Sequence, residues 1–222
     1  MQRSVIFGAS RGLGAKLVQE VCAAGELVEG WARKEPALSA LARPGFSYRL
    51  ADFSTALGQE LAVESVVRYP AKRIFCVAAG GPFGAFGDRQ WSAHEWAWQV
   101  SFVFYARLLH ALVSAKAPIP QVILVGSSVA ESAADPKAAS YCAAKHALRG
   151  LFLSLREEYP DWDLRLFSPG YMDTDMLPPH ALVRKKGVHD PARVASDLWS
   201  WALTADRGAH WVYPIHPNQE SK

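Results

Sequence analysis

A serine pair, a tyrosine and a lysine stand at spacings that suit acid–base chemistry on a carbonyl group. Ser127 and Ser128 directly follow a short apolar run, Tyr141 comes thirteen residues after Ser128, and Lys145 comes four residues after Tyr141. Positions i and i+4 share one helix face, so Tyr141 and Lys145 point the same way. A nearby ammonium favours the phenolate and predicts a lowered pKa for Tyr141. Tyr141 would then exchange a proton with a substrate oxygen that Ser128 holds by a hydrogen bond.

A glycine-rich loop near the start of the chain accompanies this pattern. It follows the first apolar run, precedes a helical pattern and contains Gly8, Ser10, Arg11, Gly12, Leu13 and Gly14. Glycines at this place let a pyrophosphate approach the backbone, while the N-terminus of the following helix faces its negative charge. A tight turn without a ligand, and an exposed helix turn for the Tyr-Lys pair, are the alternative interpretations. The two patterns together favour a nucleotide-dependent enzyme.

The end of the second predicted strand bears on which dinucleotide binds. Sites that prefer NAD place a carboxylate there, whereas this strand ends in Ala32, Arg33 and Lys34. Arg33 and Arg11 both suit a 2′-phosphate, because a guanidinium offers paired donors. Glu29 lies further back and could favour NAD, and a solvated basic turn is the plain alternative. The residues favour NADP(H) over NAD(H).

Strand and helix signals alternate along the chain, which predicts parallel βαβ units. The expected strands are Ser4–Phe7, Leu27–Ala32, Phe46–Leu50, Arg73–Val77, Val122–Val125, Leu164–Phe167 and Trp211–Tyr213. The expected helices are Leu13–Ala24, Thr55–Tyr69, Ser92–Ala115, Ala138–Tyr159 and Val194–Leu203. We therefore expect one α/β domain over residues 1–222: a three-layer, Rossmann-like, doubly wound sheet, mostly or wholly parallel, with about seven strands flanked by helices. In such sheets the ligand lies beyond the carboxyl ends of the strands.

Composition excludes several other classes of protein. The 222 residues carry 24 Lys and Arg against 21 Asp and Glu, a balance that argues against a nucleic-acid reader. No apolar run approaches the length of a membrane span, and the first residues lack the features of a secretory signal. Three widely spaced cysteines and scattered histidines predict neither a disulfide framework nor a metal site. We expect a cytoplasmic protein that binds no nucleic acid and no membrane.

On these residues the chain resembles the short-chain dehydrogenase/reductases of the compact, single-domain type. Ser128, Tyr141 and Lys145 match the catalytic serine, tyrosine and lysine of that family, and the glycine loop matches its cofactor loop. The resemblance implies that Asp52 contacts the adenine ring. It implies further cofactor contacts from Tyr141 and from Lys145, which would bind ribose. The segments after the fourth and the sixth strand would add contacts from Ala79, Gly80, Gly81, Pro169, Gly170, Met172 and Thr174.

Three positions depart from the family pattern. Phe7 stands where the family usually has a threonine, and Val77 and Ala78 replace a pair of asparagines. Ser101 replaces a catalytic asparagine that helps to hold a relay water beside the lysine. Ser101 keeps a hydroxyl that could hold this water, with a shorter reach and one fewer donor, so we expect a working but slow enzyme, with a degraded site as the competing interpretation.

The segment 173–190 corresponds to the substrate lid of the family. Phe83, Phe86, Met172, Met176 and Leu177 would give the pocket apolar walls, typical of small-molecule sites. Arg184, Lys185 and Lys186 either attract an acidic substrate or form a solvated loop. Tryptophans 91, 96 and 98 either pack in the core or face another subunit, and we expect a homodimer or homotetramer.

The resulting hypothesis is an NADP(H)-dependent oxidoreductase of class EC 1.1.1. It would reduce a ketone or aldehyde of a small, largely apolar substrate, or oxidise the alcohol, with Tyr141 as acid and base. Ser128, Phe83 and Met176 would contact the substrate, and no metal is expected. The alternative is a weak or inactive relative that acts as an NADP(H)-binding sensor or scaffold.

Overall fold

The computed structural model describes most of the 222-residue chain. It covers residues 3–35, 43–115, 118–131 and 135–218. The predicted domain of residues 1–222 thus contains five short stretches that lie outside the described residues, namely 1–2, 36–42, 116–117, 132–134 and 219–222.

Seven strands within the described residues form one sheet in the order β3-β2-β1-β4-β5-β6-β7, and every neighbouring pair is parallel. The predicted seven-stranded, Rossmann-like sheet is confirmed. The direction of winding reverses between β1 and β4, which is where such sheets bind ligands. The strands are β1 (Arg3–Phe7), β2 (Leu27–Ala32), β3 (Phe46–Leu50), β4 (Arg73–Cys76), β5 (Gln121–Val125), β6 (Leu164–Ser168) and β7 (His210–Val212).

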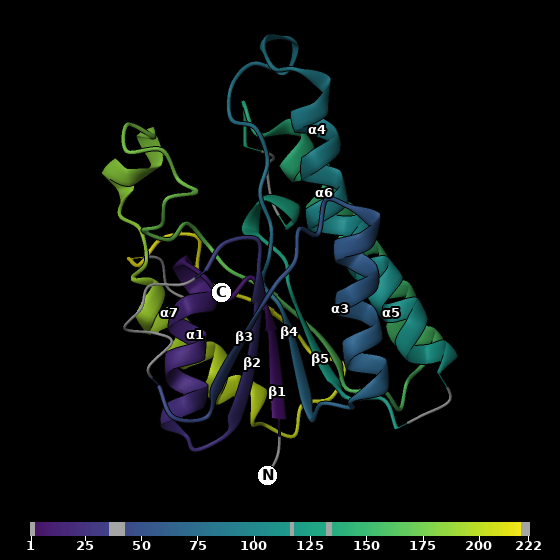
Figure 1. Ribbon diagram of the computed structural model, residues 1–222. Coiled ribbons are helices and arrows are strands. Elements are labelled where there is room, and N and C mark those ends of the chain that lie inside the picture. Colours follow the sequence, from purple (N-terminus) through teal and green to yellow (C-terminus); the bar gives the residue numbers. More distant parts are fainter. Residues whose placement is uncertain (1–2, 36–42, 116–117, 132–134, 219–222) are drawn as a thin grey trace.

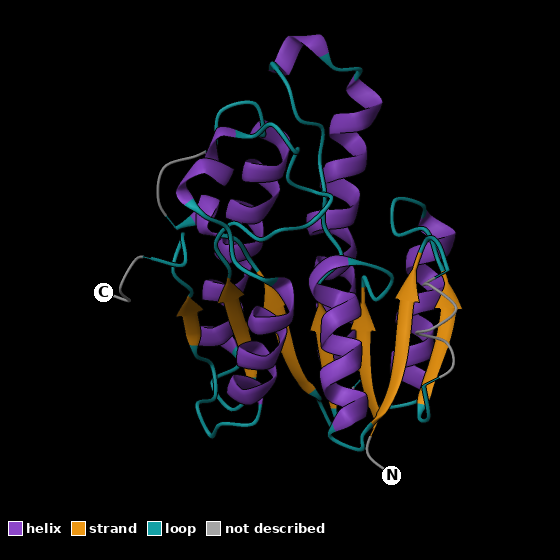
Figure 2. Ribbon diagram, turned by 90° about the vertical axis from the view of Figure 1, so that its left-hand side faces the viewer, coloured by secondary structure: helices purple, strands orange, loops and turns teal. Residues whose placement is uncertain are grey.

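Helices cover both faces of the sheet and make three layers (Figures 1 and 2). Helices α1 and α7 lie on one face, and α3, α5 and α6 lie on the other (Figure 1). No helix in the described parts of the chain is long and apolar enough to span a membrane. The helices are α1 (Gly12–Ala23), α3 (Ala56–Arg68), α4 (Trp91–Trp98), α5 (Phe104–Ser114), α6 (Ala139–Glu158) and α7 (Pro191–Ala202).

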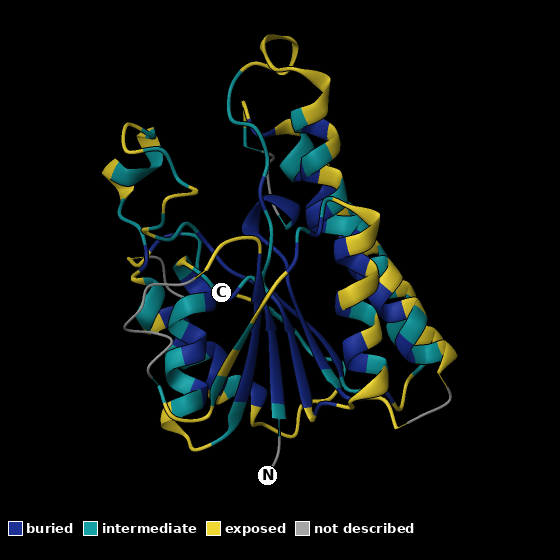
Figure 3. Cartoon of the chain, viewed as in Figure 1, coloured by how far each residue is buried: buried dark blue, intermediate teal, exposed yellow. Residues whose placement is uncertain are grey.

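The inner strands β1, β2, β4, β5 and β6 are buried on both faces, because successive side chains point to opposite sides and both sides are covered, whereas the edge strands β3 and β7 are partly exposed (Figure 3). On β1, Val5 and Phe7 pack with the α3, α5 and α6 side, while Ile6 packs with the α1 and α7 side. This continuous burial explains why the strands read as short apolar runs in the sequence.

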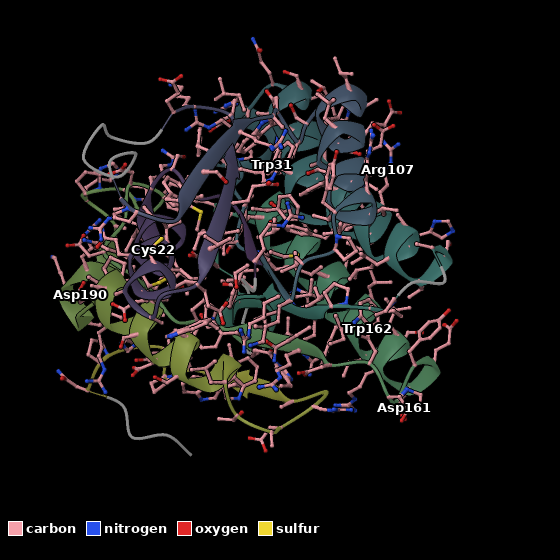
Figure 4. All side chains as sticks on the ribbon, turned by 60° about the horizontal axis from the view of Figure 1, so that its bottom comes forward. Cys22, Trp31, Arg107, Asp161, Trp162 and Asp190 are labelled. Atoms are coloured by element: carbon pink, nitrogen blue, oxygen red, sulfur yellow. The ribbon has the colours of Figure 1, made fainter. Side chains whose placement is uncertain are left out.

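Polar contacts also join two helices within one outer layer. Arg107 on α5 donates to Gln59 of α3 at 2.9 Å and forms an ion pair with Glu60 at 3.4 Å (Figure 4). These contacts tie α3 to α5 on one face of the sheet.

The predicted helix Ser92–Ala115 is wrong in one respect, because it is interrupted. The π-helical segment η2 (Gln99–Val103) separates α4 from α5. A π-turn carries an extra residue and is frequent at functional sites. Here it brings Ser101 against the backbone of Gly80, with which the Ser101 hydroxyl exchanges two hydrogen bonds.

The predicted lid, residues 173–190, has a fixed base. Met172 and His189 form a parallel bridge, and the amide of Asp173 donates to the His189 carbonyl at 2.9 Å. The 3-10 helix η4 (Leu182–Lys186) lies in the middle of the segment. Helix α7 begins at Pro191 and not at Val194, because the Asp190 side chain caps the amide of Ala192.

Candidate active site

A cleft of about 350 Å³ lies at the carboxyl ends of the strands. Most of the predicted cofactor-binding residues line it, whereas Gly80 does not and Gly81 and Gly170 line a smaller adjacent cavity. The predicted residues that line the cleft are Gly8, Ser10, Arg11, Gly12, Leu13, Gly14, Arg33, Asp52, Ala79, Tyr141, Lys145, Pro169, Met172 and Thr174.

The glycine loop forms the floor of this cleft through very close backbone contacts. Gly8 has a φ of +97°, and a methyl group there would lie 2.6 Å from the Ala78 nitrogen. A methyl group on Gly14 would lie 2.1 Å from the Gly8 oxygen. No side chain caps the N-terminus of α1, so its first amides remain available to an anion.

The end of β2 brings basic side chains to the cleft. Arg33 lies over the ring of Trp96, with its guanidinium carbon 5.6 Å from the ring centroid, and Lys34 lines the cleft beside it. Glu35 lines the same end and was missed by the sequence reasoning, because it lies two residues beyond the expected position of an acidic residue. Trp96 was expected at a surface or in the core; it lines the cleft.

Glu29, the residue that could have favoured NAD, lies elsewhere. It is buried and accepts hydrogen bonds from Arg3 at 2.8 Å and from Trp31 at 2.7 Å. Glu29 does not line the cleft, so its carboxylate serves the sheet and does not face a ribose.

Asp52 lines the cleft just after β3. One of its oxygens accepts from the Ser54 amide at 3.0 Å and from the Ser54 hydroxyl at 2.7 Å. This turn fixes the carboxylate at the cleft wall, next to Phe53, which stacks on Phe104 with ring centroids 4.2 Å apart.

Tyr141 and Lys145 share one face of α6, as their spacing predicts. Lys145 is 1% exposed, its Nζ donates to the Val125 carbonyl at 2.6 Å, and it lies 5.6 Å from the centroid of the Tyr141 ring. Burial lowers the pKa of Lys145 to about 7. The cleft thus holds an amine that titrates near neutrality.

The prediction of a lowered Tyr141 pKa is wrong in this structure. Burial raises the pKa of Tyr141 to about 12, and an interaction with the Ser127 side chain opposes the rise without reversing it. Removing the phenolate from water therefore outweighs the nearby lysine, whose own charged form is disfavoured by the same burial.

Both serines lie on the turn that follows β5 and line the smaller cavity with Tyr141. Ser128, the predicted residue, begins the 3-10 helix η3 (Ser128–Ala130), and its amide donates to the Pro169 carbonyl at 2.9 Å. Ser127 is the serine whose side chain interacts with Tyr141. The sequence reasoning gave Ser127 no role, because a spacing of thirteen residues selects Ser128.

Glu131 anchors the end of this serine turn. Its carboxylate is nearly buried, accepts from the Ser168 hydroxyl at 2.8 Å and lies 2.8 Å from a ring nitrogen of His210. Arg149 of α6 pairs with the other oxygen at 2.9 Å. The turn is thereby tied to β6, β7 and the helix that carries Tyr141.

Ser101 does not line either cavity. It is fully buried, and its hydroxyl accepts from the Gly80 amide and donates to the Gly80 carbonyl, both at 3.1 Å. The hydroxyl that was expected to hold a relay water is thus committed to Gly80. The nearby Tyr105 hydroxyl donates to the Ala78 carbonyl at 2.6 Å, so two side chains of the long helix hold the segment after β4.

The smaller cavity, of about 100 Å³, adjoins the cleft at Tyr141. Phe83, Met172, Met176 and Leu177 give it apolar walls, as predicted. Phe86 does not line it; this side chain is exposed and packs against His94. Asp135 is a further lining residue, which the sequence did not single out because it lies in a loop without a pattern.

Metal ligands are not gathered in this region. Across the parts of the chain that the structure describes, no three His, Cys, Asp or Glu side chains come together in a way that could hold a metal ion. The three cysteines are free thiols.

Comparison with known proteins gives one family. The family model for short chain dehydrogenases matches residues 2–182. An uncharacterized oxidoreductase of Mycobacterium tuberculosis is 27% identical over 247 aligned positions, which cover 96% of this chain and 94% of the relative.

Solved structures of similar fold include an alcohol dehydrogenase from the archaeon Thermococcus sibiricus, complexed with 5-hydroxy-NADP. It has a TM-score of 0.82 at 20% identity and covers 100% of this chain and 99% of its own. A 4-hydroxyisoleucine dehydrogenase complexed with NADH has a TM-score of 0.83 at 14% identity, with 98% and 99% of the two chains covered. At these identities the likeness concerns the fold alone.

The buried Lys145 predicts that stability rises with pH. The unfolded chain keeps the lysine proton up to a pKa of 10.5, while the folded chain releases it near 7. Between these values the unfolded state binds more protons, so the free energy of unfolding increases by up to about 1.4 kcal/mol per pH unit from this group. Urea unfolding of the wild type and Lys145→Met across this window would measure the difference.

We expect the stability of the wild type to gain on that of Lys145→Met as the pH rises. Lys185→Met, at an exposed position of η4, is the control and should follow the wild type at every pH. A difference between wild type and Lys145→Met that stays constant would show that the buried amine keeps an ordinary pKa.

Proposed function

The chain belongs to the short-chain dehydrogenase family and is an oxidoreductase, and we propose that it is an NADP(H)-dependent carbonyl reductase or alcohol dehydrogenase. Its substrate would be a small, largely apolar ketone or aldehyde, or the corresponding alcohol. The single observation that carries the proposal is the position of Tyr141, whose side chain lines both the cofactor-sized cleft and the smaller apolar cavity.

In this proposal Tyr141 moves the proton. Its high pKa keeps the phenol protonated at neutral pH, so it is a proton donor when a carbonyl is reduced. Ser128 holds the carbonyl oxygen, and Ser127 holds the phenol. Lys145 lies on the cleft side of Tyr141, where it would bind ribose and favour the phenolate once charged.

The cleft fits a dinucleotide on its own geometry. Gly8 and Gly14 let the loop pack directly against the backbone of Ala78 and against itself, beside the uncapped N-terminus of α1, so backbone amides line this part of the cleft. The glycine loop would hold the pyrophosphate, Asp52 the adenine, and the segment Pro169–Thr174 the nicotinamide. When bound, the reduced cofactor supplies the hydride.

Three basic side chains support NADP(H) over NAD(H). Arg11, Arg33 and Lys34 line the cleft, and Arg33 is held against Trp96. Glu29 cannot compete, because Arg3 and Trp31 occupy its carboxylate. Acidic residues also line the cleft, namely Glu35, Asp52 and Asp175, and Asp175 lies 4.0 Å from Arg11, so Arg33 and Lys34 are the cations that oppose the cost of Glu35 to a 2′-phosphate.

The departures from the family pattern support an active enzyme over a sensor or scaffold. The Tyr105 bond to Ala78 takes the place of the missing strand amides, and the Ser101 bonds to Gly80 hold the next part of the same segment. Ser101 does not take over the water-holding role of the missing asparagine, because its hydroxyl is committed to Gly80. The cleft wall is nonetheless held in place, which a degraded site would have no reason to keep.

We also propose self-association through the outer face of α4 and α5. Trp91 and Trp98 are 64% and 39% exposed there, whereas Trp96 faces the cleft. A homodimer or homotetramer would cover these rings. The free thiols fit a reducing compartment such as the cytoplasm.

Tyr141→Phe tests the mechanism. It removes the proton donor and keeps the ring, so we expect carbonyl reduction to fall by about 10²–10⁴-fold while NADPH affinity stays near that of the wild type. Steady-state kinetics on a panel of ketones and aldehydes measure the first, and fluorescence titration measures the second. Tyr69→Phe, at an exposed tyrosine, is the control.

Turnover by Tyr141→Phe equal to that of the wild type would contradict the mechanism. Tight NADPH binding by a wild type that reduces nothing on the panel would favour the sensor or scaffold instead.

Alanine substitutions distinguish the roles of Ser127 and Ser128. Both variants are assayed in the oxidation direction, where Tyr141 must accept a proton. Ser127 holds the Tyr141 pKa below the value that burial alone would give, so Ser127→Ala should shift the rise of activity to more alkaline pH. Ser128→Ala should lower kcat/KM by roughly 10-fold or more without moving that rise, since it removes the proposed hydrogen bond to substrate and leaves the Ser127 interaction with Tyr141 in place. A shift caused by Ser128→Ala and not by Ser127→Ala would reverse the two roles.

Arg33→Gln tests cofactor preference. Loss of a charge-assisted contact to the 2′-phosphate should weaken NADPH binding by roughly 10–100-fold and leave NADH binding little changed. Energy transfer from tryptophan to the reduced nicotinamide would report both affinities, with Trp96 in the cleft as a donor. The matched control is Arg193→Gln on the surface of α7. Tighter binding of NADH than of NADPH by the wild type would contradict the preference.

A further inference from the structure

The smaller cavity contains one acidic side chain among apolar walls. Asp135 lines it together with Phe83, Met172, Met176 and Leu177, and Tyr141 lies where the cavity meets the cleft. A carboxylate in a small, mostly apolar cavity is costly unless something compensates its charge. The partners of Asp135 therefore bear on what the cavity binds.

Asp135 has no cationic partner within the described residues. Its Oδ2 accepts from the Tyr171 hydroxyl at 3.2 Å, and its backbone oxygen accepts from the Ala138 amide and from the Cys142 thiol. No described lysine, arginine or histidine forms an ion pair with it. None of the described residues forms a hydrogen bond or an ion pair with the second carboxylate oxygen of Asp135, Oδ1.

Tyr171 holds the carboxylate in place. Its ring stacks on His216 with centroids 5.6 Å apart, and a nitrogen of that imidazole lies 2.8 Å from the Gly187 carbonyl. The backbone of Tyr171 is fixed as well, since its amide donates to Ile215 and its carbonyl accepts from His189. A neutral phenol bound to one oxygen orients Asp135 and leaves its negative charge in place.

The basic residues of the lid do not supply a counter-charge. Arg184 forms an ion pair with Asp173 at 2.6 Å and donates to the carbonyls of Leu177 and Pro178. It closes the lid segment on itself and does not line the cavity, and neither do Lys185 and Lys186. Of the two interpretations of these residues, attraction of an acidic substrate therefore has no support from their positions, which fit a solvated loop.

We propose that the substrate carries a positively charged amino group in addition to its carbonyl, and that Asp135 is the residue that binds this amino group. This inference rests on the proposed function and names the substrate class of the same site. The carbonyl lies at Tyr141, the apolar part of the molecule contacts the methionines and Phe83, and the ammonium pairs with Asp135. An ion pair in a small cavity with mostly apolar walls is stronger than the same pair at the surface.

Matched ketones test the proposal. 3- and 4-(aminomethyl)acetophenone are cations at neutral pH, and 3- and 4-ethylacetophenone match their shapes without the charge. For at least one of the two positions, the wild type should favour the cation at least 10-fold in kcat/KM. Asp135→Asn keeps the acceptor for Tyr171 and removes the charge, so the ratio within each pair should fall towards one.

Two control variants separate charge from shape. Tyr171→Phe removes the hydroxyl and keeps the carboxylate, so the preference for the cation should persist. Asp88→Asn, at an exposed position of η1 (Phe86–Asp88), should keep the wild-type ratio. Because each ratio is taken within one protein, a change in overall rate cancels.

A wild type that reduces both members of each pair equally well, or a preference that survives Asp135→Asn, would overturn the proposal while the proposed function stands. Calorimetric binding of the corresponding cationic and neutral alcohols, in the presence of NADP⁺, makes the same comparison without turnover. If no ketone is reduced but the cationic alcohols still bind at least 10-fold tighter, and only with Asp135 intact, the proposed function fails and the binding site remains.

Discussion

The whole cleft depends on how closely β1 approaches the chain that leaves β4. The Phe7 carbonyl accepts hydrogen bonds from the amides of both Val77 and Ala78, and Gly8 lies so near Ala78 that no side chain fits between them. Sharing one acceptor turns the chain off the sheet directly after β4. The phosphate loop and the opposite wall of the cleft are thereby fixed side by side at the point where the winding of the sheet reverses, and the long helix only has to hold that wall.

Burial, more than the pairing of neighbouring charges, sets the protonation of the site. Tyr141 and Lys145 are both enclosed, so the neutral form of each is favoured: the pKa of the phenol rises and that of the amine falls. A buried ammonium and a buried phenolate become favourable together only when the charge of one compensates the other or a bound anion compensates the ammonium. The number of protons held in the cleft is therefore coupled to what binds in it. The nearby thiol of Cys76 stays protonated, because burial raises its pKa more than the charge of Lys145 lowers it.

Sequence alone predicted the sheet and the pairing of Tyr141 with Lys145, because both follow from local periodicity. It could not predict the π-helical break at Ser101, since an extra residue in one helical turn leaves no hydrophobic pattern of its own. The Ser127 contact and the position of Asp135 depend on how loops fold against α6, which is a tertiary property. The predicted lowering of the Tyr141 pKa was wrong for the same reason. The spacing of Tyr141 and Lys145 identifies neighbours on one helix, but it does not show how deeply they are buried.

A charge in the smaller cavity would orient a substrate in the proposed function. The cleft presents Arg11, Arg33 and Lys34, but Glu35, Asp52 and Asp175 line it too, and the phosphates of the cofactor would occupy its basic groups. The smaller cavity presents Asp135, and Tyr141 lines both spaces. A cationic end of the substrate attracted to Asp135 would leave the uncharged carbonyl end for the phenol, so electrostatic attraction at one end would favour the reactive orientation at the other.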